Sequence, residues 1–143
     1  MSKHYGSAVW KGKLPDGEGK MKLGSLDLEA DYTFCTRFED CEGTSPEEFI
    51  GAAHSGCFSM YLSHLLNEKG YQPEEINTSA EVEIKKKEDG EIIITQINLE
   101  TKVRADIEEE AEFEKIANNA KENCPVSLAL AGVENVTLTA ELI

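Results

Sequence analysis

The sequence predicts an α+β fold in which three strands, a long central helix, two strands, two helices and a final strand follow one another, in the order βββ-α-ββ-αα-β. Three observations carry this prediction. Short apolar segments bounded by glycine and proline fill the first third of the chain and recur after residue 76. A helix with clear start and stop signals runs between them. The 143 residues suit one domain of ordinary size, which we expect to span 1–143.

The first third is expected to form three strands. They cover residues 4–10, 20–24 and 26–32 and are separated by glycines or by a turn at 15–17. In the third strand, apolar residues at every second position from Leu26 to Tyr32 alternate with acidic ones, as in a strand with one buried face. Residues 33–38 then lead into a polar turn.

The central helix is marked at both ends. Ser45 and Glu48 form a capping box, and Pro46 occupies the first helical position, where its missing N–H costs nothing. The helix is expected to reach Lys69, with Gly70 as the residue that ends it. Two interior glycines cost about 1 kcal/mol each, so another backbone is expected to lie close to this helix.

The second half predicts two strands, two helices and a strand. Residues 77–87 and 91–103 alternate and are joined by a turn, and a change of apolar phase between Ile94 and Ile97 predicts a bulge. A helix is expected from Asp106, with Glu109 as its capping partner, to about residue 123. A short helix then restarts at 124–130, and an alternating strand covers 136–142.

The charge of the chain narrows the classes of partner. Twenty-eight acidic residues against 14 basic ones give a formal charge of −14. Such a surface repels phosphate backbones and anionic lipid, so nucleic acid and membrane are poor partners. No apolar run reaches the length of a membrane span, and the first residues lack a signal-peptide core, so the expected location is the cytoplasm.

Four cysteines are expected to be thiols in that reducing compartment unless chemistry oxidises them: Cys35, Cys41, Cys57 and Cys124. The simplest interpretation of each is a buried structural thiol. Zinc is disfavoured because the spacings contain no C-x2-4-C pair.

Two of these cysteines have informative positions. Cys57 lies on the apolar face of the central helix, where burial alone would raise its pKa, so a reactive Cys57 needs positive charge, from Arg37, Arg104 or a histidine. Cys124 precedes a proline and is expected at the start of the short helix, where free N–H groups and the helix dipole lower a thiol pKa. The alternative is that Cys124 merely caps the helix.

Three segments together are similar to the OsmC/Ohr family over essentially the whole chain. They are Thr36-Arg37-Phe38-Glu39, the stretch Gly43 to Met60 with Pro46-Glu47-Glu48 and His54-Ser55-Gly56-Cys57, and Cys124-Pro125-Val126-Ser127. Arg37 is the first arginine of the chain, which favours the OsmC branch, because the arginine of the Ohr branch lies nearer the N-terminus.

The resemblance implies an intertwined homodimer with two sites near the subunit interface. It implies reduction of organic hydroperoxides, and more weakly of hydrogen peroxide, in oxidative and osmotic stress defence. No metal, haem or flavin cofactor is implied; an external thiol, such as a lipoyl dithiol, recycles the enzyme. By resemblance, Cys57 attacks the peroxide, Cys124 resolves the sulfenic acid, Arg37 stabilises the thiolate and Glu47 holds Arg37.

Several assignments stay open. Glu47 lies ten residues before Cys57, about 15 Å along the same helix, so either Arg37 bridges much of this gap or Glu47 of the partner chain reaches the site, and we expect the second. A further alternative is that Glu47 is a simple charge at the helix N-terminus. His54, one turn from Cys57, is more simply a packed histidine. Cys35 and Cys41 lie outside the family pattern and are reactive bystanders, alternative resolving thiols or inert.

Two rival functions use the same fold. A thiol redox sensor would form the same disulfide but turn over slowly, whereas a non-catalytic binding protein would need no thiolate.

Overall fold

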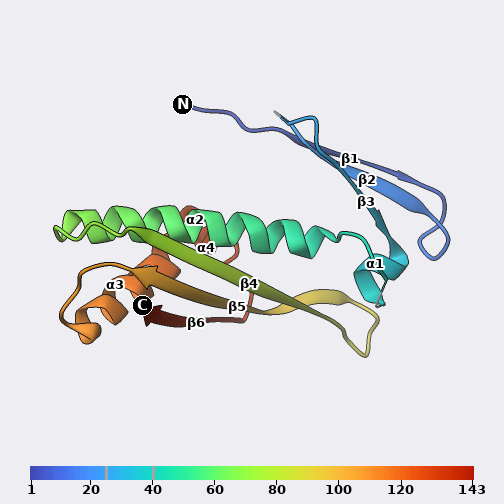
Figure 1. Cartoon of the computed structure of the whole chain (residues 1–143). Coiled ribbons are helices and arrows are strands. Elements are labelled where there is room, and N and C mark those ends of the chain that lie inside the picture. The colour runs from blue at the N-terminus through green and yellow to red at the C-terminus, as the bar shows by residue number, and fades with distance from the viewer. Residues whose placement is uncertain (25, 40) are drawn as a thin grey trace. The chain divides into compact units, whose positions relative to one another are not determined.

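The computed structural model describes residues 1–24, 26–39 and 41–143, in two compact units: the N-terminal unit, Met1–Glu48, and the C-terminal unit, Phe49–Ile143. The elements in chain order are β1 (Gly6–Lys11), β2 (Glu18–Leu23), β3 (Glu29–Thr33), α1 (Phe34–Phe38), α2 (Pro46–Glu68), β4 (Glu75–Lys86), β5 (Ile92–Arg104), α3 (Glu110–Asn123), α4 (Pro125–Ala129) and β6 (Asn135–Leu142) (Figure 1). The predicted α+β class is confirmed. That residues 1–143 form a single domain stays a prediction.

The N-terminal unit holds the antiparallel sheet β1-β2-β3. The three predicted strands exist, but the third begins three residues later than expected, at Glu29. The expectation that Leu26 and Leu28 share a buried strand face is wrong, because both side chains are more than half exposed. The pairing of β2 with β3 reaches only from Glu18↔Thr33 to Lys22↔Glu29, so the earlier residues have no sheet to lie in.

Helix α1 was not expected, since residues 33–38 were predicted to lead into a turn. Thr33 caps it: its side chain accepts a hydrogen bond from the Thr36 N–H at 3.2 Å, and the Thr33 N–H donates to Thr36 Oγ1 at 2.9 Å. This is a capping box in which a hydroxyl replaces the usual Glu or Gln side chain. The Thr-x-x-Thr spacing was therefore the missed signal.

Helix α2 begins at Pro46 as predicted and ends at Glu68, one residue before the predicted end at Lys69. The Ser45 N–H donates to Glu48 Oε2 at 2.9 Å and the Glu48 N–H to Ser45 Oγ at 3.2 Å, and Gly70 takes the left-handed conformation with φ of 87°. The close approach of another backbone is confirmed at Gly51, where a Cβ would lie 3.2 Å from the Ala80 carbonyl oxygen of β4. It is not found at Gly56, which faces open space among the described residues.

The C-terminal unit carries the sheet β4-β5-β6, with β4 and β5 antiparallel and β5 and β6 parallel. The predicted bulge is confirmed, because the register shifts between Glu83↔Gln96 and Ile84↔Ile94, leaving Thr95 as the extra residue. Helix α3 starts at Glu110, so the expected start at Asp106 is wrong. Four of the five residues at 106–110 are acidic, and each of these suits a helix N-terminus, so charge does not select the first one.

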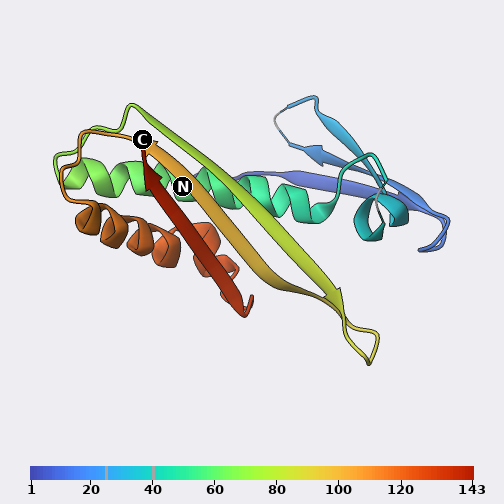
Figure 2. The same ribbon diagram turned by 60° about the horizontal axis from the view of Figure 1, so that its bottom comes forward.

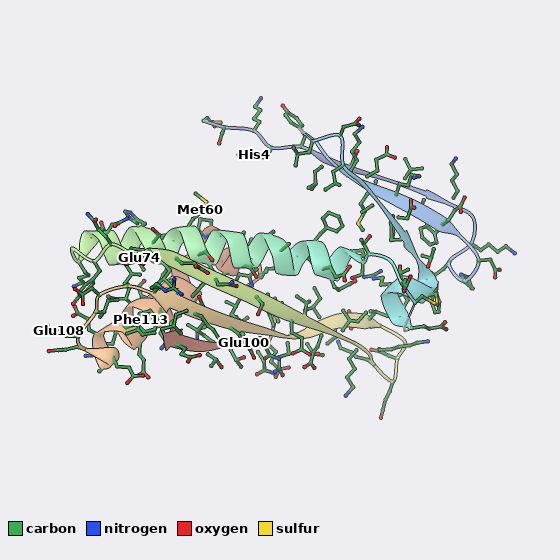
Figure 3. All side chains as sticks on the ribbon, in the orientation of Figure 1. His4, Met60, Glu74, Glu100, Glu108 and Phe113 are labelled. Atoms are coloured by element: carbon green, nitrogen blue, oxygen red, sulfur yellow. A yellow bond between two sulfur atoms is a disulfide. The ribbon has the colours of Figure 1, made fainter. Side chains whose placement is uncertain are left out.

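Helices α2 and α3 cover the same face of this sheet (Figure 2). The core between them consists of Phe58, Leu62, Leu66, Leu99, Val103, Phe113, Ile116, Ala117, Ala120 and Cys124. Met60 instead projects from α2 on the side away from this sheet, with 79% of its surface exposed (Figure 3). Within the described ranges, no helix is both long enough and apolar enough to span a membrane.

Candidate functional site

The C-terminal unit brings the two predicted site cysteines together. Cys57 lies on α2 and Cys124 at the start of α4; both are free thiols, and the Cys124 thiol is within hydrogen-bonding reach of the Cys57 sulfur. Cys57 is half-buried, whereas Cys124 is completely buried. An accessible sulfur beside an inaccessible one suits an attacking and a resolving thiol, although these roles stay predictions.

The start of α4 explains how the two sulfurs are held. Cys124 adopts an extended backbone, φ −64° and ψ 143°, as expected before proline, and begins α4 as predicted; its sulfur also caps the helix, as in the alternative interpretation. The Ser127 N–H donates to Cys124 Sγ at 3.4 Å, and the Val126 backbone lies near enough to the Cys57 sulfur to lower the pKa of that thiol. The first turn of α4 therefore lies beside both sulfurs.

These contacts do not make Cys57 acidic by themselves. Burial raises the pKa of the Cys57 thiol, the Val126 backbone lowers it, and the neighbouring Cys124 raises it again, so that the pKa lies above its ordinary value. A Cys57 thiolate at neutral pH therefore needs a positive charge, as the sequence indicated.

Next to Cys124 lies a hydrogen-bonded pair of side chains, Ser127 and His54, that the sequence did not predict. Ser127 Oγ lies 3.0 Å from Cys124 Sγ and 2.7 Å from His54 Nε2. His54 is wholly buried, and this burial lowers its pKa, so the ring is neutral at neutral pH. The prediction of a packed, hydrogen-bonded His54 is confirmed, but its Ser127 partner was missed. The available signal was the place of Ser127 three residues after the cap residue Cys124.

Arg37 and Glu47 form an ion pair within the N-terminal unit. Arg37 Nε donates to both carboxylate oxygens of Glu47, at 3.0 and 3.1 Å, and Nη2 donates to Oε1 at 2.6 Å. Glu47 is 6% exposed, so its carboxylate is shielded from solvent, whereas Arg37 is partly exposed and lies over the Phe38 ring at 5.0 Å. Glu47 is therefore more than a free charge at a helix N-terminus.

Cys35 and Cys41 are joined in a disulfide, so the expectation of four thiols is wrong for this pair. The turn of α1 brings their Cα atoms to 5.5 Å, within the range of a disulfide. Both sulfurs and a Glu39 carboxylate oxygen lie within 4.8 Å of one another, so in the reduced state three donors would be grouped here. Structural zinc sites almost always use four ligands, and residues 1–24, 26–39 and 41–143 supply three here.

Comparison with known proteins identifies the family. The profile of the OsmC-like protein family matches residues 39–139. Proteins named Peroxiredoxin OsmC, from Escherichia coli (strain K12) and Shigella flexneri, are each 41% identical over 138 residues, which is 96% of this chain and 94% of theirs. This chain therefore belongs to the OsmC family, which confirms the resemblance seen in the sequence. It is a cysteine-based peroxidase.

Solved structures agree on the fold. An OsmC-like protein from Mycoplasma pneumoniae superposes with a TM-score of 0.75 at 14% identity, over 99% of this chain and 98% of that one. The organic hydroperoxide resistance protein OhrB of Bacillus subtilis superposes with a TM-score of 0.66 at 23% identity, over 97% and 98%.

Proposed function

We propose that this protein reduces organic hydroperoxides, and hydrogen peroxide more weakly, to alcohol and water through a Cys57 sulfenic acid and a Cys57–Cys124 disulfide. Its role would be defence against oxidative and osmotic stress. The observation that carries the proposal is the proximity of two free thiols of unequal exposure, Cys57 on α2 and Cys124 at the start of α4. The names of its relatives, peroxiredoxin and organic hydroperoxide resistance protein, support it.

The reaction has three steps. The Cys57 thiolate attacks the distal oxygen of the hydroperoxide, which breaks the O–O bond, releases the alcohol and leaves Cys57 as a sulfenic acid. The Cys124 sulfur then attacks the Cys57 sulfur, forming the disulfide and releasing water. An external thiol reduces the disulfide through a mixed disulfide, and a dithiol such as a lipoyl group would complete that step without a second molecule. The cycle uses no metal or other cofactor.

Arg37 supplies the charge that Cys57 needs in this proposal. A guanidinium beside the sulfur stabilises the thiolate and the charge that develops on the leaving oxygen. Glu47 positions the guanidinium by its three hydrogen bonds. Glu47 and Cys57 stand ten residues apart on one helix, about 15 Å along its axis, and we therefore place the Arg37–Glu47 pair of one subunit at the Cys57 of the other.

The N-terminal unit supports a homodimer. Its buried residues, within the part that the structure describes, are Gly17, Gly19, Ser45 and Glu47, so it has no apolar core of its own. Large apolar side chains are instead more than half exposed there, among them Val9, Leu14, Leu26 and Leu28. Exposed apolar surface of this kind marks an interface. A second copy of the chain would cover it, and residues 1–143 would act as one domain of an intertwined dimer in the cytoplasm.

The decisive experiment measures steady-state consumption of an organic hydroperoxide with a dithiol present. We expect wild type to turn over many times, Cys57→Ser to consume nothing above background, and Cys124→Ser to stop after its first turnover as a sulfenic or over-oxidised species. The matched control is the double variant Cys35→Ser/Cys41→Ser, which keeps both free thiols and should keep its turnover.

Two results would count against the proposal. Wild type that leaves the peroxide untouched with dithiol present is not a hydroperoxide reductase. Wild type that forms the disulfide once but does not cycle is a redox sensor.

A further inference from the structure

Three side chains around the resolving cysteine form a hydrogen-bonded chain that ends in an unused base. Cys124 Sγ, Ser127 Oγ and His54 Nε2 follow one another at 3.0 and 2.7 Å. Cys124 and His54 are both completely buried. Among the described residues, His54 Nδ1 is the one buried side-chain nitrogen or oxygen that has no hydrogen-bond partner. A neutral histidine kept at this cost calls for an explanation beyond packing.

Two proton arrangements of this chain differ in whether Cys124 is a thiol or a thiolate. In the first, the Cys124 thiol donates to Ser127 Oγ, the Ser127 hydroxyl donates to His54 Nε2, and Nδ1 carries the ring proton. In the second, two protons have moved: Ser127 donates to a Cys124 thiolate and accepts from His54 Nε2–H. The Ser127 N–H, at 3.4 Å, donates to the sulfur in both. In the second arrangement the Cys124 thiolate accepts hydrogen bonds from both the hydroxyl and the N–H of Ser127. Both groups already lie at hydrogen-bond distance from the sulfur, so only protons need to move.

Cys124 needs such a route because solvent cannot reach it. To attack a sulfenic acid it must act as a thiolate, yet its sulfur is fully buried and no water can take its proton. Burial keeps His54 neutral, so the ring is free to accept a proton when the attack begins.

We propose that Ser127 and His54 form a proton relay that ionises Cys124 as it resolves the Cys57 sulfenic acid. The inference rests on the Cys57–Cys124 mechanism proposed above. Ser127 is a catalytic residue because it touches the reacting sulfur, and His54, which acts through Ser127, is a positioning residue that holds the proton.

The step balances in atoms and electrons. The S–S bond forms as the S–O bond of Cys57 breaks, and the electron pair leaves with the hydroxide. The Cys124 proton passes to Ser127 while the Ser127 proton passes to His54. The same path returns a proton to the hydroxide, which leaves as water. Cys57 sulfenic acid and Cys124 thiol therefore give one disulfide and one water, with no other reactant.

The test separates the two half-reactions in a single turnover. Reduced protein is mixed with an organic hydroperoxide, peroxide loss reports sulfenic acid formation, and mass spectrometry after dimedone trapping follows conversion to the Cys57–Cys124 disulfide. We expect Ser127→Ala and His54→Gln each to slow disulfide formation about 100-fold, the scale of general-base catalysis, with peroxide loss at the wild-type rate.

Two further variants separate the relay from simple packing. Ser127→Thr keeps the hydroxyl and should resolve within about threefold of wild type, a small fraction of a general-base effect. Ser59→Ala is the matched control: Ser59 also lies on α2 and hydrogen-bonds Thr78 Oγ1 at 2.8 Å, in a separate polar chain that continues to Thr101. It should leave both half-reactions unchanged.

Three outcomes would overturn the relay. Equal disulfide formation in wild type and Ser127→Ala removes Ser127 from the step. Normal resolution in His54→Gln shows that Ser127 acts without the histidine, and equal slowing of both half-reactions shows a packing defect. These outcomes leave the proposed function standing, because wild type still forms the disulfide. Wild type that forms no Cys57–Cys124 disulfide overturns both proposals.

Discussion

The two units of this chain differ in what they bury. The C-terminal unit buries large apolar side chains of α2, β5 and α3, and its two free sulfurs stand at the edge of that core. The N-terminal unit buries glycines and polar residues and leaves apolar side chains exposed, yet it carries the Arg37–Glu47 ion pair. The two free sulfurs therefore lie in the unit that has an apolar core, whereas the ion pair lies in the unit whose described residues have none.

Substitutions in the core of the C-terminal unit should have the largest effects on the free energy of unfolding. Phe113→Ala removes a fully buried ring and should lower the free energy of unfolding by about 3–5 kcal/mol. Leu26→Ala would change it by less than about 0.5 kcal/mol if this side chain were as exposed in solution as it is in one chain, but the dimer proposed above covers Leu26, so we expect a larger loss. Urea denaturation measures both. A loss at Leu26 as large as that at Phe113 would mean that this side chain is covered in solution, and size-exclusion chromatography at several concentrations would show whether a second copy covers it.

The next effect concerns the ion pair. Arg37→Leu should lower kcat/KM for an organic hydroperoxide by about 100- to 1000-fold, the cost of losing a charge that stabilises a developing anion. Arg37→Lys should recover only part of this, because an ammonium group cannot reproduce the hydrogen bonds from Nε and Nη2 to the Glu47 carboxylate. Arg104→Lys, at an exposed arginine, is the control and should retain wild-type kinetics.

Mixed dimers would decide which subunit supplies the arginine. A dimer of one Cys57→Ser chain and one Arg37→Leu chain has one complete site if the pair acts across the interface, and none if it acts within a chain. We expect about half the wild-type activity per dimer, since one of two charge-supported sites remains. Activity no higher than that of the Arg37→Leu homodimer would place the arginine in the same chain as its cysteine.

The Cys35–Cys41 disulfide should raise the free energy of unfolding by less than the loss expected for Phe113→Ala. Closing a loop of seven residues between Cys35 and Cys41 stabilises a folded chain by about 2 kcal/mol in the loop-entropy model. We expect peptide mapping without reductant to find this pair bonded, and the Cys35→Ser/Cys41→Ser variant to unfold at lower urea than the oxidised wild type. With reductant the difference should vanish. A Cys35–Cys57 bridge after peroxide treatment would instead make Cys35 an alternative resolving thiol.

Sequence reasoning succeeded where a local signal fixes a local structure. The ends of α2 follow from Ser45, Glu48 and Gly70, and the bulge in β5 follows from the apolar phase. Cys124 begins α4 because proline follows it. Each of these features is decided by neighbours within about four residues, the range over which capping and turn preferences act.

It failed where the deciding partner is distant or unusual. The start of β3 depends on how far its pairing with β2 extends, and the alternation from Leu26 does not show that extent. Ser127 acquires its meaning from His54, 73 residues away, and no spacing rule connects them. The Cys35–Cys41 bond depends on α1, which was itself missed because a threonine stands where a capping box usually has Glu or Gln.

The smallest predicted effect is on the pH dependence of stability, and it arises from His54. Burial lowers the pKa of His54 in the folded protein below the ordinary value of 6.5, so below that pH the unfolded chain binds a proton that the folded chain does not. Stability contributed by the neutral ring is therefore complete above pH 6.5 and falls as the pH decreases, by at most about 1.4 kcal/mol per pH unit for one proton.

Urea denaturation between pH 7.5 and 5 should show a shallower decline for His54→Gln than for wild type, whereas His64→Gln, at an exposed histidine of the same helix, should match wild type. Identical slopes for His54→Gln and wild type would mean that His54 is not held neutral, and the ring would then be unable to take the proton of Cys124.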